Sequence, residues 1–406
     1  MSRLIKQIVL ALSILVMAYV AAGYVLQHSS DDKTYRSLTV YSEVLDHVER
    51  DYVEDPDMRQ VTTGALHGLL DSLDPDSSYL SPLEYTDYKQ RIQSKPEGTS
   101  GVALSKRNGY IVVISILPDS PAQKAGLHAG DYFESIAGFT TSQMAIGQAQ
   151  VLLTGQPGST VKLSVIRRNR VEPEDMEVTL EKMPEPKILE DRIEGDIAYV
   201  RLPVLDTPMV NRLRDKLTQL QSAGAHKLIL DLRDCAIGEP SDGVSAAQLF
   251  LPSGKIASLK GQTVAEQTFS ADPSKVVWKE PVSLLISSAT AGAAEVLAAA
   301  VSDNHRGETI GDRTFGTASS QKVITLDDGS ALILTVANYF TPDGKSIPAE
   351  GVAPTVEETA DDVAALNDEQ QGIAPPPGQV ASPNDPLLKK AIDILQGNAP
   401  AAKKAA

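Results

Sequence analysis

Two short stretches of this 406-residue chain, residues 287–295 and 314–322, gather side chains that could take part in nucleophilic chemistry. These side chains are Ser287, Ser288, Thr290, Thr317, Gln321 and Lys322. A hydroxyl attacks a carbonyl carbon when a neighbouring base takes its proton and N–H groups hold the resulting oxyanion. The two stretches could support acyl transfer only if they present a hydroxyl and a base to one another. On a strand Lys322 points to the opposite face from Gln321, and Thr290 faces away from the start of the predicted helix, so the residues alone do not establish such a pair.

Other reactive side chains are sparse and isolated. The chain has one cysteine, Cys235, so no intrachain disulfide can form. The basic residue nearest to it in sequence is Arg233, and a lone cysteine of this kind is typical of a buried position. His226 lies at a predicted turn after a helix, and His305 lies at a predicted surface turn. We interpret both as structural. The spacing of His, Cys, Asp and Glu indicates no metal site, and no cofactor is expected.

The elements that must position these residues alternate between strands and helices over residues 184–358. Predicted strands cover 197–202, 228–232, 282–286 and 330–339, and predicted helices cover 209–223 and 291–303. This alternation predicts an α/β core. Ser287 and Ser288 then lie at the end of a strand, immediately before a helix.

Residues 97–183 have a different texture, with short strands at 110–116 and 160–166 and short helices at 119–127 and 143–153. The order of elements, with the run over residues 120–131, resembles bacterial PDZ domains. Such domains add a peptide as an extra strand and hold its terminal carboxylate with backbone N–H groups. The resemblance implies a peptide-binding strand and helix at Gly101, Val102, Ala103, Leu104, Leu152 and Leu153. The two leucines are equally well interpreted as ordinary core residues.

The two ends of the chain carry different signals. Arg3 and Lys6 precede an apolar run over residues 8–26, close to the ~20 residues that span a bilayer. This pattern predicts a membrane anchor within residues 1–30 and an extracytoplasmic location for the remainder. A cleaved signal ending near residues 20–22 is the alternative. Residues 31–96 are predicted to be helical, with a turn at 74–78. Residues 359–406 are acidic and Pro-rich, and indicate a flexible tail with one helix at 386–395.

The whole of residues 35–395 resembles the carboxyl-terminal processing peptidases, also called tail-specific proteases. These are extracytoplasmic Ser–Lys peptidases with an inserted PDZ domain. Matching motifs occur in order at residues 51–53, 72–80, 228–233, 311–316 and 339–347. The resemblance implies a multidomain α+β and α/β fold: a helical N-terminal region, an inserted PDZ domain and an α/β tail-specific-protease core.

The chain departs from the family pattern at the positions that carry the chemistry. Aligned on Glu295, the nucleophilic serine of the family falls on Gly292, and the lysine that acts as its base falls on Thr317. The third member, a glutamine, falls on Gln321 and is retained. The two glycines of the oxyanion loop fall on Ile237 and Gly238. Glycine cannot attack a carbonyl, and threonine cannot act as a base near neutral pH.

The sequence therefore favours a catalytically inactive relative that binds C-terminal tails of proteins through its PDZ domain, or that scaffolds an active peptidase or a homo-oligomer. A serine-type endopeptidase with a non-standard nucleophile, such as Thr290 or Cys235, is the alternative. A purely structural role, with the PDZ domain closed inside an oligomer, is a third. The net charge of −16 argues against nucleic acid as a partner.

Overall fold

A computed structural model of the chain describes residues 37–142, 144–167, 170, 172–357 and 378–398, together with Met17. Apart from Met17, the predicted anchor at residues 8–26 lies outside the described residues, as do the cleavage-site alternative at 20–22 and residues 358–377 and 399–406 of the tail. Within the described ranges, none of the helices combines the length and the apolar character that crossing a bilayer requires.

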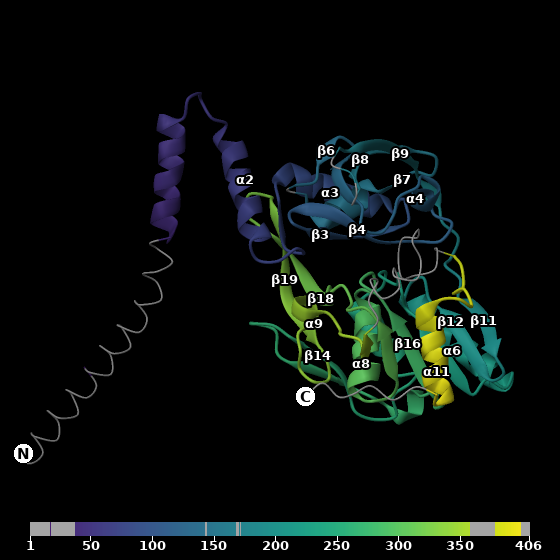
Figure 1. The fold of residues 1–406 in the computed structure, drawn as a ribbon. Coiled ribbons are helices and arrows are strands. Elements are labelled where there is room, and N and C mark those ends of the chain that lie inside the picture. Colours follow the sequence, from purple (N-terminus) through teal and green to yellow (C-terminus); the bar gives the residue numbers. More distant parts are fainter. Residues whose placement is uncertain are drawn as a thin grey trace, which may run out of the picture. The chain divides into compact units, whose positions relative to one another are not determined.

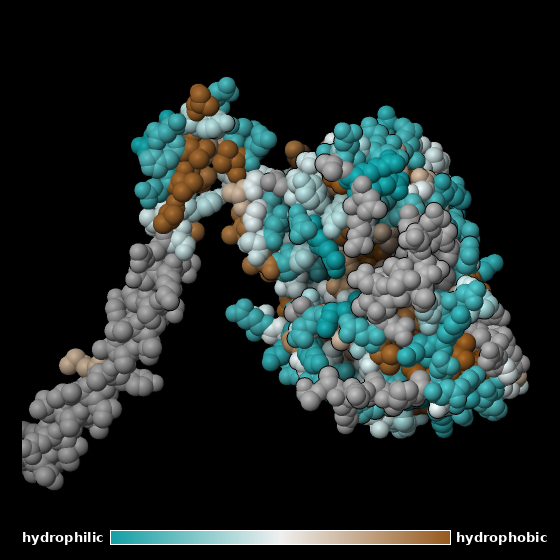
Figure 2. Space-filling view, in the orientation of Figure 1, coloured by the Kyte–Doolittle hydropathy of each residue, from teal (hydrophilic) through white to brown (hydrophobic). Residues whose placement is uncertain are grey.

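The chain divides into two units, residues 1–65 and 66–406. In the first, a helix over residues 37–51 is followed by the start of α2 (Met58–Asp71), as the helical pattern predicts. Figure 2 shows apolar side chains gathered on this helical segment. Leu38, Val40 and Val44 are each more than half exposed there.

The core of the second unit is a six-stranded sheet in the order β11-β12-β13-β16-β17-β20 (Figure 1). Its strands are Leu189–Glu194, Ile197–Arg201, Lys227–Asp231, Val282–Ile286, Glu308–Gly311 and Val356–Glu357. All neighbours are parallel except β11 and β12. The predicted α/β core is confirmed, and β16 has the predicted bounds. The pattern did not predict β11, because its charged residues do not alternate with apolar ones.

Successive residues of the core strands serve opposite faces of the sheet, as the period of two requires. Leu228, Leu230 and Leu284 pack with α6 (Thr207–Ser222), α7 (Pro240–Ala247) and α8 (Ala293–Asp303) on one face. Ile229 and Leu285 pack with α11 (Pro386–Gln396) on the other. The sheet is therefore enclosed between two helical layers, and α8 is buried along nearly its whole length.

A second, five-stranded sheet is built around the long strand β19, which pairs directly with three strands. β19 (Ala331–Phe340) lies between β1 (Ser78–Leu80) and β14 (Lys255–Lys260), β15 (Gln267–Ser270) pairs with β14, and β18 (Ser319–Thr325) pairs with β19. β1 begins at the last residue of the predicted turn at 74–78 and was not predicted, because its three residues are too few to show a strand pattern. Helix α3 (Pro82–Ser94) follows, capped by Ser81 and Glu84. Two further short elements of this unit are the 3-10 helix η1 (Pro273–Lys275) and α9 (Ile347–Glu350).

Residues 98–182 form a small β domain with its own apolar core. Its sheet has the order β3-β4-β5-β8-β9, with bounds Val102–Arg107, Tyr110–Ile116, Tyr132–Ile136, Thr160–Ile166 and Glu174–Thr179, and β6 (Phe139–Thr140) pairs with β5. The helices are α4 (Pro121–Lys124) and α5 (Ile146–Leu152), and β2 (Gly98–Thr99), β7 (Thr154–Gly155) and β10 (Glu181–Lys182) form a smaller sheet. The strand at 160–166 does not close the domain as predicted. β9 pairs with it, and its polar run did not indicate a strand.

Candidate functional site

The strand-to-helix turn after β16, which we call the Gly292 turn (residues 287–292), positions the predicted nucleophile residue. Gly292 is the N-cap of α8, with φ 58° and ψ −114°. This φ is in the region where glycine is favoured over other residues. A Cβ atom at this position would also lie 3.1 Å from the carbonyl oxygen of Gly238. A serine at position 292 would therefore be strained and crowded.

Glu295, on the first turn of α8, joins the two stretches that the sequence singled out. Its fully buried carboxylate accepts hydrogen bonds from the backbone N–H groups of Gly292 (2.9 Å), Gly316 (2.6 Å) and Thr317 (2.8 Å), and from the hydroxyl of Thr314. Burial raises the pKa of Glu295, and these hydrogen bonds oppose the rise. We call this arrangement the Glu295 clamp. It brings positions 292 and 317 together, as the motif spacing implied.

Thr290 and Cys235, the two residues considered as alternative nucleophiles, have buried positions, whereas Ser288 is exposed. Thr290 is fully buried; its hydroxyl donates to the carbonyl of Leu232 (2.9 Å) and accepts from the N–H of Ser287 (2.9 Å). Cys235 is also fully buried, and burial raises the pKa of its thiol, which keeps the thiol protonated. Neither side chain is presented to a substrate.

The segment expected to bind an oxyanion, residues 234–238, follows β13 and packs against the Gly292 turn. The carbonyl of Cys235 accepts from the N–H of Ala291 (3.0 Å), and the carbonyl of Ile237 accepts from Leu205 (2.7 Å). Gly238 has φ 141°, and a Cβ there would meet the carbonyl oxygen of Leu205 at 2.1 Å, so this position requires glycine. The atom of this 234–238 loop that a Cβ at position 292 would approach is the Gly238 carbonyl oxygen, at 3.1 Å.

The retained glutamine lies in a hydrogen-bonded chain that the sequence did not reveal. The Gln321 amide donates to the hydroxyl of Ser319 (2.6 Å), which donates to the carboxylate of Asp76 (3.0 Å). Burial raises the pKa of Asp76 to about 6. Lys322 is exposed on β18. Asp76 lies within the matched motif at 72–80, but no sequence signal pairs it with a residue 243 positions away.

Buried charges at the end of β13 and the start of α11 support the segment from which the 234–238 loop departs. Arg233 is fully buried and donates to both carboxylate oxygens of Asp231 (Nη2–Oδ2 2.6 Å) and to Asp385 (2.8 Å) at the start of α11. Although burial alone would raise the pKa of Asp231, the Arg233 guanidinium lowers it. Tyr199 donates a further hydrogen bond to Asp231 (2.6 Å). This network fixes the strand end from which the loop departs.

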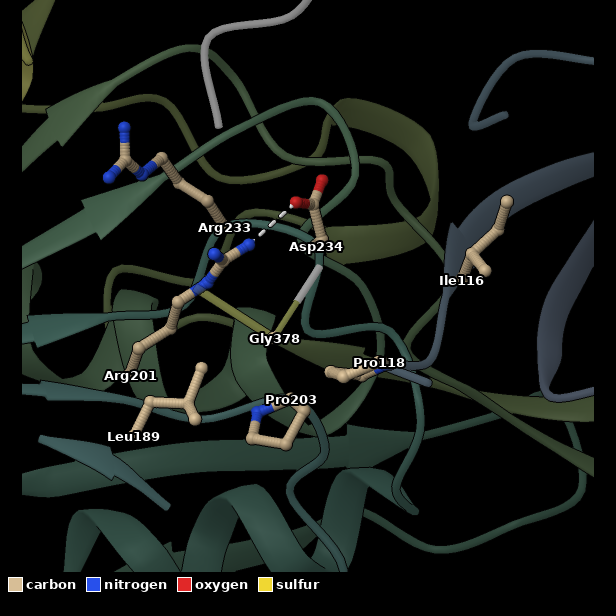
Figure 3. Close-up of a pocket in the computed structure, with 8 residues that line it drawn as sticks. All are labelled: Ile116, Pro118, Leu189, Arg201, Pro203, Arg233, Asp234 and Gly378. Atoms are coloured by element: carbon tan, nitrogen blue, oxygen red, sulfur yellow. Dashed lines mark hydrogen bonds and ion pairs between the residues drawn. The ribbon is translucent and has the colours of Figure 1, made fainter. Parts of the chain in front are cut away.

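Figure 3 shows a small pocket where the loop meets the β domain. Arg201 and Asp234 point toward one another and form an ion pair of 3.0 Å, while Ile116 and Pro118 line the pocket from the end of β4. Burial raises the pKa of Asp234 to about 6, although Arg201 opposes the rise. Both guanidinium groups that line the pocket, those of Arg201 and Arg233, bind protein carboxylates.

The predicted peptide-binding residues meet at one edge of the β domain. Gly101 has φ 78°, and a Cβ there would meet the Ser120 side chain at 2.4 Å. It leads into β3, the terminal strand of its sheet, which contacts α5. Val102 and Leu152 pack at the border of the apolar core, whereas Leu104 and Leu153 lie inside it at 7% and 2% exposure. Leu153 is thus a core residue, and Ala103 points to the opposite face of the sheet, as described below.

Comparison with known proteins agrees with this architecture. Residues 196–358 match peptidase family S41, and residues 98–180 match the PDZ domain. The chain is 31% identical to a carboxy-terminal-processing protease of Bartonella bacilliformis, over 81% of this chain and 76% of the relative. It is 29% identical to the carboxy-terminal processing protease CtpA of Bacillus subtilis, over 79% of this chain and 68% of the relative.

Among solved structures, a photosystem II D1 C-terminal processing protease superimposes with a TM-score of 0.64 and 25% identity. The match covers 79% of this chain and 92% of that protein. The chain therefore combines a PDZ domain with an S41 core and is similar over most of its length to carboxy-terminal processing proteases.

Proposed function

Because the chain belongs to the carboxyl-terminal processing peptidase family, we propose that it is a catalytically inactive member that binds C-terminal peptide tails through its PDZ domain. The observation that carries the proposal is the environment of Gly292. This position has no side chain to attack a carbonyl, and the Gly238 carbonyl oxygen lies where a serine Cβ would need room. Thr317 supplies no amine to accept a proton, and Ile237 stands in the oxyanion loop.

Tail binding is supported by the geometry of β3. This strand ends its sheet, so its outer edge is placed to pair with an added strand. The neighbouring helix α5 and the apolar residues Val102 and Leu152 provide a surface for an apolar C-terminal side chain. The close approach of Gly101 to Ser120 shapes the turn that would receive the carboxylate.

Location and partners follow from the proposed activity and the N-terminal sequence. We propose that residues 8–26 hold the protein in a membrane and that residues 31–406 are extracytoplasmic, where exported proteins present their C-termini. An active peptidase relative or a second copy of the chain is a further partner in this proposal. No nucleic acid, metal or cofactor is part of it.

Fluorescence anisotropy with the full-length protein tests tail binding. A labelled peptide with an apolar C-terminal residue and a free carboxylate should bind at least about tenfold more tightly than the same peptide ending in an amide. Gly101→Val should abolish this preference. Gly109→Val is the matched control, because Gly109 also has φ near 80° but lies in the β3–β4 hairpin with open space around its Cβ position. Equal binding of the two peptides would contradict the proposal.

Mass spectrometry of the same peptides after long incubation tests inactivity. We expect them to remain intact. Cleavage would support the alternative, an active endopeptidase with a non-standard nucleophile, and Thr290→Ala and Cys235→Ala variants would then identify the attacking residue. Absence of both binding and cleavage would leave the purely structural role.

A further inference from the structure

The outer face of the β domain packs directly on the segments around Gly292. Ala103 of β3, Ile114 of β4 and Ala291 of the Gly292 turn form one apolar cluster and are exposed by 7%, 5% and 2%. Ile237 and Phe315 are half-buried against the same cluster. Side chains from three separate segments of the core therefore meet the PDZ sheet at one contact, which we call the PDZ seat.

A cation–π contact extends the PDZ seat toward the end of β3. The Arg107 guanidinium lies 4.1 Å from the centre of the Phe315 ring. A guanidinium at this distance is attracted by the electron-rich face of the ring. The Phe315 N–H donates to the carbonyl of Thr290 (2.9 Å), so the ring is fixed to the Gly292 turn. Arg107 and Ala103 thus attach both ends of β3 to the core.

The seat does not occupy the proposed peptide groove. Leu104 points into the core of the PDZ domain beside α5, whereas Ala103 points to the opposite face and joins the PDZ seat. One face of β3 therefore borders the groove and the other is held by the core. A tail could bind at the edge of β3 without displacing the seat.

Ile237 gives the contact a feature that a glycine could not supply. Its branched apolar side chain reaches the PDZ seat, while its backbone is fixed through the hydrogen bond from Leu205. A glycine at position 237 would contribute no side chain to the PDZ seat, so less apolar surface would be removed from water there.

We propose that Ile237 fastens the PDZ domain to the core, so that the two domains form one rigid receptor. Ile237 stands in place of an oxyanion glycine, and its side chain helps to hold the PDZ seat closed beside Gly292. This inference rests on the proposed function, because a rigid arrangement of the two domains suits a protein that binds C-terminal tails and does not cleave them. The closure itself is measurable without any peptide.

Hydroxyl-radical footprinting of the full-length protein measures the closure through the oxidation rate of the Phe315 side chain. Ile237→Asp places a charge in the apolar seat and should increase oxidation of Phe315 by about tenfold. Val323→Asp is the matched control: Val323 is 45% exposed on β18, outside the seat, and its substitution should leave Phe315 unchanged. An unchanged rate in Ile237→Asp would overturn the proposal.

A second variant guards against loss of folding. Ile114→Asp disturbs the same seat from the PDZ side and should also expose Phe315. Phe133, inside the PDZ domain, and Trp278, inside the core, are fully buried and report whether each domain remains folded. Protection of all three rings in Ile114→Asp would show that the domains do not depend on the seat, and would contradict the inference whatever the outcome of the peptide-binding experiment.

Discussion

The Glu295 clamp and the 234–238 loop meet at Gly292 but differ in what they contribute to the site. The clamp is polar and fully satisfied: four donors converge on one buried carboxylate. The loop presents a carbonyl oxygen and the apolar side chain of Ile237. The frame that holds the backbone of a peptidase site can therefore be complete while the groups that would touch a substrate are absent.

The largest expected effect comes from breaking the clamp. Glu295→Ala leaves three buried N–H groups and the Thr314 hydroxyl without their acceptor, and should destabilise the protein by about 4 kcal/mol. Denaturant unfolding measures this loss. The control is Glu266→Ala. Glu266 is exposed on the surface of the peptidase-like domain, so this change should alter stability by less than about 0.5 kcal/mol. A small effect at Glu295 would mean that water replaces its hydrogen bonds.

Removing the buried contact between Arg233 and Asp385, which supports the 234–238 loop, is expected to lower the free energy of unfolding somewhat less. Asp385→Ala removes one of the two carboxylates that accept from Arg233, and it also removes the cap of α11, where the Asp385 carboxylate accepts from the N–H groups of Leu387 and Leu388. We expect a loss of about 2–3 kcal/mol in denaturant unfolding. Asp385→Asn retains a capping oxygen and should recover part of the loss. Equal losses in the two variants would assign the whole effect to the ion pair.

Restoring the serine and the lysine of the family pattern, at positions 292 and 317, tests the difference between the Glu295 clamp and the 234–238 loop directly. Gly292→Ser combined with Thr317→Lys should leave peptides intact in mass spectrometry, because the 234–238 loop still presents the Gly238 carbonyl and Ile237. The serine alone should cost about 1–2 kcal/mol, since position 292 has a positive φ and a crowded Cβ position. Cleavage by the double variant would show that the loop can rearrange into an oxyanion site.

The smallest expected effect is a pH dependence of stability. Asp76 and Asp234 each have a pKa of about 6, above the ordinary value of 3.8. Between pH 4 and 6 the folded state holds protons that the unfolded state has released, so their contribution to stability falls as the pH rises through this window. We expect the free energy of unfolding to decrease over this window for each group.

Thermal unfolding of Asp76→Asn across the same range isolates the share of Asp76. The variant should show a flatter pH profile, because the amide stays neutral and still offers an oxygen to Ser319. Asp175→Asn, at an exposed position of β9, should leave the profile unchanged. A profile of Asp76→Asn identical to that of the unsubstituted protein would place the titration elsewhere.

The sequence predicted best the elements whose own pattern decides their structure. The β-branched run at 110–116 and the apolar run at 282–286 have the predicted bounds, and the helix expected at 386–395 ends one residue later. The short strand β1 and the polar strand β9 were missed, because each is stabilised by pairing with β19 or β8 rather than by its own composition.

For the site, motif spacing placed Gly292 beside Thr317 but not the interactions that hold them. The Glu295 clamp and the Asp76–Ser319 hydrogen bond join residues about 20 and 243 positions apart, and such pairings exist only once the chain has folded. The direction of the Gly238 carbonyl is likewise a property of the packed loop. Ile237 was identified as a departure in the sequence, but its contact with the PDZ sheet could not be predicted from a single position.

The position of α11 along the chain constrains the order in which the core can form. Ile229, Leu285 and Ile310 remain without their helical cover until residues 387–391 have been synthesised. Arg233 likewise lacks the Asp385 carboxylate until that part of the chain has been synthesised. The core is therefore completed late in synthesis. A chain that ends before α11 would expose the apolar face of the sheet, which favours aggregation and recognition by chaperones and proteases.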